Sequence, residues 1–319
     1  MIKDGLFVLN DTTLSNIISI SKKQSVLEER RICELSELAY DAVDFFKLML
    51  NEGYGIYEIL SMMSEGVNFS PDEPHSDSLD ENFSKLISHL KTISAAEKAI
   101  ISEMLVNRLK EIDYQISEND FFGAGPMDET ITYVKNPLAD EAFDVFSQDF
   151  KNPKLKYSKN FSEIIKALRS GDAQYAILPI EEKGGARLGS IAELIFTEDF
   201  KINSIIPVFG FEGNADMKYA LISNSFIVPE LSADDDKYLE IRIPKDSSSM
   251  SPTELFIATD ALSLEIYKIN TIAFTTEEGS VPFYSIVFKN CGKDFSSLLV
   301  FLTLFSGNYT PVGIYKNLE

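Results

Sequence analysis

A glycine-rich turn between two cations is the feature of this sequence best suited to chemistry. Residues 183–187 read Lys-Gly-Gly-Ala-Arg and stand just before a helix expected to begin at Gly189. Backbone N–H groups at such a turn can point at an anion, and the two cations add positive charge. The spacing lacks the Gly-x-x-x-x-Gly-Lys-Ser/Thr pattern of a P-loop, and a solvated turn is the alternative interpretation. The candidate ligand-binding residues are Lys183, Gly184, Gly185 and Arg187.

Other groups of reactive side chains are poorly arranged. Glu181 and Glu182 are adjacent at the end of an expected strand, so they point to opposite sides and make a poor acid–base pair. His75 and His89 have no cysteine or second histidine at ligand spacing. We therefore predict no metal site and no cofactor, and we interpret the two glutamates as solvated charges at a turn.

The composition is that of an ordinary soluble globular protein. The chain has 319 residues, 45% of them hydrophobic, and a formal net charge of −21. Such an acidic chain repels phosphate backbones and anionic membranes, so we expect neither nucleic acid nor membrane as a partner. Cys33 and Cys291 cannot make a disulfide framework, and the first residues lack the pattern of a signal peptide. We expect a cytoplasmic location.

The elements that must position the turn fall into three expected domains. Residues 1–125 are predicted to be helical, because apolar residues recur every three or four positions in 35–50 and Ser94 to Glu97 forms a capping box. The segment 64–82 holds six acids and no Lys or Arg, which predicts a solvated loop or, as the alternative, an arm that contacts a basic partner. A Gly-Ala-Gly-Pro run within 117–128 predicts a linker.

Strands alternate with helices beyond the linker. Residues 126–234 predict an α/β lobe with a mainly parallel sheet, and the strand 173–180 is apolar enough to be buried on both faces. Residues 235–319 predict the order βαββαβ, which is the ferredoxin-like arrangement. In that unit the first helix is expected from Pro252 to about Tyr267 and the second from Asp294 to Phe305.

The segment from Gly171 to Glu181 reads Gly-Asp-Ala-Gln-Tyr-Ala-Ile-Leu-Pro-Ile-Glu. It resembles the Gly-x-Ala-Asp-Tyr-(apolar)-Pro-Ile-Glu-Asn signature of the prephenate dehydratases, which implies a lobe of the periplasmic-binding-protein kind. The tail, with Val312-Gly313-Ile314-Tyr315, is similar to the ACT regulatory module of many such enzymes. The order of the three domains is also that of bifunctional chorismate mutase–prephenate dehydratases. An ACT module further implies a homodimer, packed edge to edge.

The sequence departs from this family where the chemistry is done. The positions equivalent to the family's functional residues are Glu181, Lys218 and Tyr219, but Met217 replaces the threonine whose hydroxyl is central to dehydration. Methionine has no proton to give, so we assign no catalytic residue. The segment between Val208 and Lys218 is also too short for the family's second lobe, so we expect half of the cleft walls to be absent.

Three hypotheses follow for the function. The first is a catalytically degenerate, one-lobed relative of prephenate dehydratase that binds a small carboxylate or an amino acid and serves regulation. The second is a diverged prephenate dehydratase, possibly bifunctional, whose mutase site would use the helical domain's cations, Arg30, Arg31, Lys91, Lys98 and Arg108. The third is a purely structural interaction protein.

Overall fold

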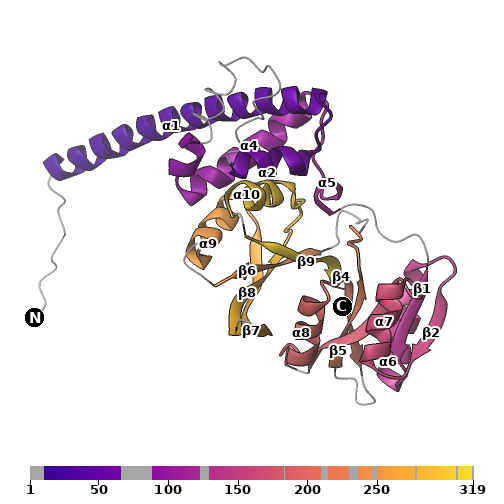
Figure 1. Cartoon of the computed structure of the whole chain (residues 1–319). Helices are drawn as coiled ribbons and strands as arrows, with labels where there is room; N and C mark the ends of the chain where they lie inside the picture. Colours follow the sequence, from indigo (N-terminus) through magenta and orange to yellow (C-terminus); the bar gives the residue numbers. More distant parts are fainter. Residues whose placement is uncertain are drawn as a thin grey trace, which may run out of the picture.

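The computed structural model shows a mixed α/β protein with one large sheet and a helical N-terminal part (Figure 1). The described residues are 11–65, 88–122, 129–182, 184–209, 215–229, 236–245, 250–276, 279–306 and 308–317. Most of the acidic segment 64–82 and the second half of the expected linker therefore lie outside the described residues.

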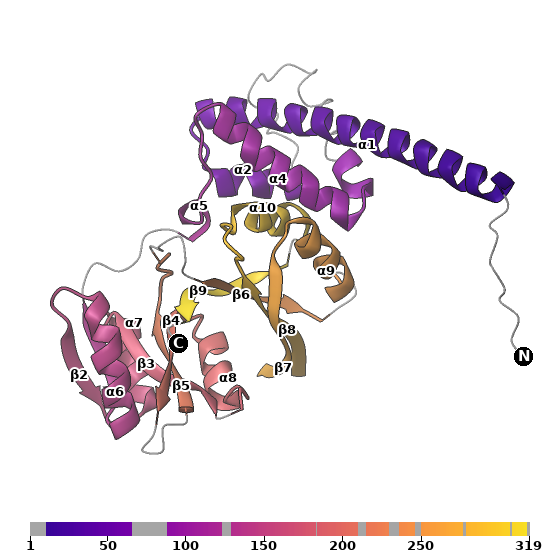
Figure 2. The same ribbon diagram turned by 180° about the vertical axis from the view of Figure 1, so that it is seen from behind.

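The N-terminal part is helical, as predicted. Its helices are α1 (Asp11–Asn51), α2 (Ile56–Glu65), α4 (Ala95–Glu111) and α5 (Asn119–Phe122). The apolar positions of α1 from Leu35 onward pack against α2 and α4, and Phe46 and Leu105 are fully buried. The other half of α1 runs well past the neighbouring helices (Figure 2). Because tertiary packing supplies most helical stability, the buried half of α1 anchors this helix.

The predicted capping box begins α4. The Glu97 N–H donates to Ser94 Oγ (3.4 Å), and the Ser94 N–H donates to Glu97 Oε2 (2.7 Å). Arg31 Nε of α1 donates to Glu97 Oε1 at 2.7 Å. This bond from Arg31 is the largest cause that lowers the pKa of Glu97 to about 2, and the bonds with Ser94 act in the same direction. The carboxylate therefore joins the start of α4 to α1.

The next elements form a lobe of five strands. Its strands are β1 (Thr130–Val134), β2 (Lys154–Ser158), β3 (Tyr175–Glu182), β4 (Lys201–Phe209) and β5 (Ala215–Ser223). Its helices are α6 (Pro137–Phe146), the short 3-10 helix η1 (Ser147–Asp149), α7 (Phe161–Ser170) and α8 (Gly189–Thr197). Helix α6 packs on one face of the sheet, and α7 and α8 pack on the other.

The lobe's sheet is mixed. Strand β1 is parallel to β2 and β3, as the alternation of strands and helices predicted. Strand β5, however, lies between β3 and β4 and is antiparallel to both. The reason is the short connection from Phe209 to Ala215, because antiparallel neighbours can be joined by a short turn while parallel neighbours need a long crossover.

The C-terminal part follows the predicted βαββαβ order. Its elements are β6 (Lys237–Pro244), α9 (Pro252–Ala261), β7 (Glu265–Thr276), β8 (Gly279–Lys289), α10 (Ser296–Phe305) and β9 (Thr310–Asn317). The prediction of a helix up to Tyr267 was wrong, since α9 ends at Ala261 and Tyr267 lies in β7. Ser263 has a φ of 57°, and this left-handed turn ends the helix before the apolar pattern does.

Within the described residues, one sheet of nine strands joins the lobe to the C-terminal part. The strand order is β2-β1-β3-β5-β4-β9-β6-β8-β7, and β4 pairs with β9 in parallel at the junction. Gly313 of β9 faces Ile202 of β4, where a Cβ atom would lie 2.5 Å from the Ile202 carbonyl oxygen. A glycine is therefore needed for the two strands to approach this closely.

Helix α10 lies between the sheet and the N-terminal helices (Figure 1). Val300 and Leu304 pack among the N-terminal helices, while Leu298 and Leu302 pack toward the sheet. A buried ion pair fastens the same junction, since Lys237 Nζ donates to Glu118 Oε1 at 3.0 Å. The N-terminal helices are thus packed directly on the C-terminal part.

Candidate functional site

The glycine turn predicted from the sequence closes a small loop after β3. The Gly185 N–H donates to the Glu182 carbonyl (2.9 Å), and the Glu182 N–H donates to the Ala186 carbonyl (3.0 Å). Gly184 and Gly185 have φ values of 103° and 83°, which glycine adopts without steric cost. The turn brings Arg187 back beside Glu181 as an isolated bridge. Lys183, the remaining predicted binding residue, lies outside the described residues.

Arg187 is held inside the protein by two carboxylates. Its Nε lies 3.2 Å from Glu181 Oε1, and its Nη2 donates to Glu240 Oε2 of β6. Burial alone would lower the pKa of Arg187, but the charges of Glu240 and Glu181 outweigh it and raise that pKa. Arg187 is therefore paired with protein carboxylates and joins the lobe to the C-terminal part, while its role in binding a ligand stays a prediction.

Glu240 is the centre of this buried charge cluster. It accepts hydrogen bonds from Ser285 Oγ (2.9 Å) and from the Tyr315 hydroxyl (3.3 Å), in addition to Arg187. Its exposed fraction is 2%. Burial, followed by the nearby Glu240 charge, raises the pKa of Tyr315 well above its usual value. Tyr315 is thus a hydrogen-bond donor and a weak acid.

Lys268 of β7 spans the cleft between the two parts. Its Nζ donates to Glu181 Oε1 and to the Gly185 carbonyl, each at 2.8 Å. Sequence reasoning missed Lys268, which stands in an unremarkable strand. It also missed Glu240. A charged residue inside a strand that is buried on both faces needs a partner of opposite charge, so its presence could have indicated a buried ion pair.

These residues border a cleft of about 390 Å³ on the α8 side of the sheet. Its lining residues are Glu181, Gly184, Gly185, Arg187, Ile205, Lys218, Tyr238, Tyr267, Lys268, Val287 and Tyr315. The lobe forms one wall, and strands β6 to β9 form the other. Among the described residues no second lobe lies between β4 and β5, as the short segment before Lys218 predicted, and the other wall of this cleft comes instead from strands β6 to β9.

The structure separates the three family-equivalent residues. Glu181 and Lys218 are partners in the register of β3 and β5, and both line the cleft. Tyr219 lies on the other face of the sheet, among the residues packed on α6, and its hydroxyl donates to Asn136 Oδ1 at 3.4 Å. Burial raises the pKa of Tyr219. Tyr219 therefore cannot act on a ligand in the cleft.

Lys218 differs from the other cations of the cleft. Arg187 and Lys268 are paired with carboxylates, whereas Lys218 makes no ion pair within the described part of the chain. It is half-buried and borders the cavity. The cleft therefore offers one cation that is not committed to a protein carboxylate among the described residues.

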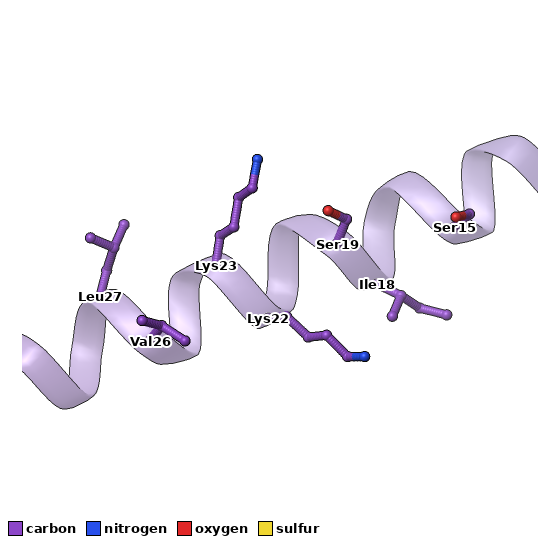
Figure 3. Close-up of a pocket in the computed structure, with 7 residues that line it drawn as sticks. All are labelled: Ser15, Ile18, Ser19, Lys22, Lys23, Val26 and Leu27. Carbon is purple, nitrogen blue, oxygen red and sulfur yellow. The ribbon is translucent and has the colours of Figure 1, made fainter.

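A larger hollow of about 690 Å³ lies along the projecting half of α1 and offers no comparable arrangement. Ser15, Ser19, Lys22 and Lys23 are its polar lining residues, and Figure 3 shows the side chains leaving one helix in different directions. Because its described lining comes from one helix, no second described wall faces these groups. We assign no function to it.

Three of the five cations suggested for a mutase site are paired with glutamates. Arg31 is paired with Glu97 of α4, and Arg30 and Arg108 are paired with glutamates on their own helices. No group of three or more His, Cys, Asp and Glu suited to a metal occurs among the described residues. Within the same residues, no helix is both long and apolar enough to span a membrane.

Comparisons with known proteins give weak likenesses. The sequence matches no protein-family model and no curated protein. Among solved structures, prephenate dehydratase from Streptococcus mutans is 19% identical, with a TM-score of 0.47, over 60% of this chain and 100% of its own. Prephenate dehydratase from Arthrobacter aurescens in complex with L-Phe is 15% identical, with a TM-score of 0.42, over 58% and 89%. A quorum-quenching acylase is 16% identical, with a TM-score of 0.41, over 60% and 96%. Likenesses of this size establish no activity.

Proposed function

We propose that this chain is a catalytically degenerate relative of prephenate dehydratase that binds a small carboxylate or an amino acid and serves regulation. The cleft carries this proposal. It gathers Glu181, Gly184, Gly185, Arg187 and Lys218, which the sequence had separately singled out, into one cavity of about 390 Å³. A concave site with a few converging polar groups on an apolar floor is typical of small-ligand sites.

The same cleft is poorly equipped for dehydration. Loss of a hydroxyl group needs a proton donor placed against it. Met217 has none, Tyr219 lies on the opposite face of the sheet, and Tyr315 is a weakened acid. Glu182 is exposed, whereas Glu181 is buried, so the expectation that both glutamates are solvated was wrong for Glu181. We therefore infer binding without turnover.

In this proposal the C-terminal residues 235–319 are an ACT-like unit. The strand order β9-β6-β8-β7 with two helices on one face supports this assignment. The N-terminal helices cover α10, while β7 is the last strand of the sheet. A homodimer would therefore use the β7 edge, because an edge strand offers unpaired backbone groups. Light scattering should give about twice the chain mass of 35.8 kDa, and a monomer mass contradicts the dimer.

Prephenate dehydratase activity is the second candidate function. One observation favours it: the cleft has two walls and three cations, which a substrate with two carboxylates would need. The mutase half of this alternative lacks such support, because Arg30, Arg31 and Arg108 are each paired with a glutamate.

Two assays separate the candidates. Purified protein is incubated with prephenate and with chorismate, and substrate loss and phenylpyruvate are followed. We expect no turnover above buffer, and clear turnover of prephenate supports the second candidate instead. A thermal-shift panel of aromatic amino acids and pathway acids then tests binding, since a ligand at 100 times its Kd stabilises the folded state by about 2.7 kcal/mol. A panel without any shift leaves the structural interaction protein as the remaining hypothesis.

The binding assay has a matched pair of variants. Lys218→Met removes the uncommitted cation of the cleft and should abolish the shift. Lys156→Met removes an exposed lysine of β2, paired with Asp172 at the far edge of the sheet, and should leave the shift unchanged. If the ligand-induced thermal shift is lost equally in both variants, binding in the cleft is contradicted.

A further inference from the structure

We infer that the cleft selects a ligand with a single negative charge and a flat apolar body, and that it discriminates against a dicarboxylate. This inference rests on the proposed function and names the ligand class of that site. It departs from the second candidate function, whose substrate carries two carboxylates.

The charged residues around the cleft determine which net charge a ligand should carry. Among the described residues, Arg187, Lys218 and Lys268 are positive, and Glu181 and Glu240 are negative. One positive charge is therefore left over. Because Lys218 is the cleft cation that makes no ion pair among the described residues, one anionic group placed on Lys218 brings the sum of the described cleft charges to zero.

A second carboxylate would have to take a cation from the protein. Arg187 is shared between Glu181 and Glu240, and both partners are buried. Lys268 is held by Glu181 and by the Gly185 carbonyl. Removing Arg187 would leave the buried Glu240 without a cation, and removing Lys268 would leave Arg187 as the one described cation for both buried carboxylates. Either change is unfavourable. A second negative charge would also lie close to Glu181.

The walls of the cleft determine the rest of the ligand. Ile205 and Val287 present aliphatic side chains to the cavity. Tyr238 and Tyr267 meet edge to face, with ring centroids 5.1 Å apart. Tyr267 is 47% exposed, so its ring is accessible from solvent. Aromatic rings pack well against such surfaces, which favours a flat apolar body over a sugar or a phosphate ester.

The test compares ligands that share a phenyl ring and differ in charge. Hydrocinnamate carries one carboxylate, phenylsuccinate two, phenylalanine one carboxylate and one ammonium, and phenylpropanol none. Isothermal titration measures each Kd at neutral pH on the full chain. We expect hydrocinnamate to bind at least about tenfold more tightly than each of the others, because only its charge matches that of the cleft.

The variants locate the interaction. Lys218→Met should remove the preference for hydrocinnamate over phenylpropanol, and Lys218→Arg should restore it by restoring the charge. Lys156→Met, distant from the cleft, should retain it, and circular dichroism and thermal unfolding check that all variants fold.

The outcomes separate this inference from the proposed function. If phenylsuccinate or phenylalanine binds more tightly than hydrocinnamate and this binding depends on Lys218, the preference for a single negative charge is refuted. The cleft is then still a binding site. Absence of binding by every probe overturns the inference, and the panel of amino acids and pathway acids then decides the proposed function separately. Unchanged hydrocinnamate binding by Lys218→Met overturns the role of Lys218.

Discussion

Replacing Glu240 by alanine should weaken the fold more than any surface substitution near the cleft. The Glu240 carboxylate is 2% exposed and accepts hydrogen bonds from Arg187, Ser285 and Tyr315. Its loss leaves the buried Arg187 with Glu181 as its remaining partner and leaves two hydroxyl donors without an acceptor. Removing one member of a buried ion pair typically costs about 3–5 kcal/mol.

Thermal unfolding followed by circular dichroism measures this effect. A loss of about 3 kcal/mol corresponds to a Tm lowered by roughly 4–5 °C, because a chain of 319 residues has an unfolding entropy of about 0.67 kcal/mol/K. Glu182→Ala is the matched control, because Glu182 is exposed on the neighbouring turn and should change stability by less than about 0.5 kcal/mol. Equal Tm values for Glu240→Ala and Glu182→Ala would refute the idea that the Glu240 cluster holds the two parts together.

Three further predictions concern the junctions of the fold. Gly313→Ala should destabilise the protein by about 1–3 kcal/mol in urea unfolding, because the added Cβ would lie 2.5 Å from a backbone oxygen of β4. Gly189→Ala is the control and should leave the free energy of unfolding nearly unchanged, because the space around Gly189 is open. Glu118→Ala should speed amide hydrogen exchange in α10, since Lys237 loses its carboxylate partner at the junction with the N-terminal helices; unchanged exchange contradicts a role for this pair. The pKa of Glu97 is lowered to about 2 in the folded state from 4.5, so its contribution to stability is present above pH about 4.5 and is lost as the pH falls toward 2. Glu97→Gln should therefore make the free energy of unfolding depend less on pH between these two values. If the pH dependence of acid unfolding is the same in the variant, this role of Glu97 is contradicted.

The local elements of the fold could be predicted because their signals are local. The capping box at Ser94 and the alternation of strands and helices after residue 130 depend only on nearby residues. The antiparallel course of β5 could have been predicted from the short segment before Lys218, which permits a turn but no crossover. The division into domains at residues 125 and 234 stays a prediction, as do the ACT assignment and the cytoplasmic location.

The site could be predicted from the sequence in part. The glycine turn was singled out because its residue types are distinctive, and Lys218 because it corresponds to a position of the family motif; both border the cleft. The second wall was not found, since β7 lies about 50 residues beyond Lys218 and reaches the cleft through tertiary packing. For the same reason Arg187 was assigned to a ligand, although Glu240 of a distant strand already binds it.

The single sheet beneath both walls determines how a ligand can enter. In proteins with two separately hinged lobes, a ligand is trapped when the lobes swing together. Here the β4–β9 pairing is a backbone ladder, so a swing would have to break that ladder together with the salt bridges above it. If the proposed function holds, the cleft is therefore preorganised, and a ligand would enter past the exposed part of its lining, which includes the half-exposed ring of Tyr267.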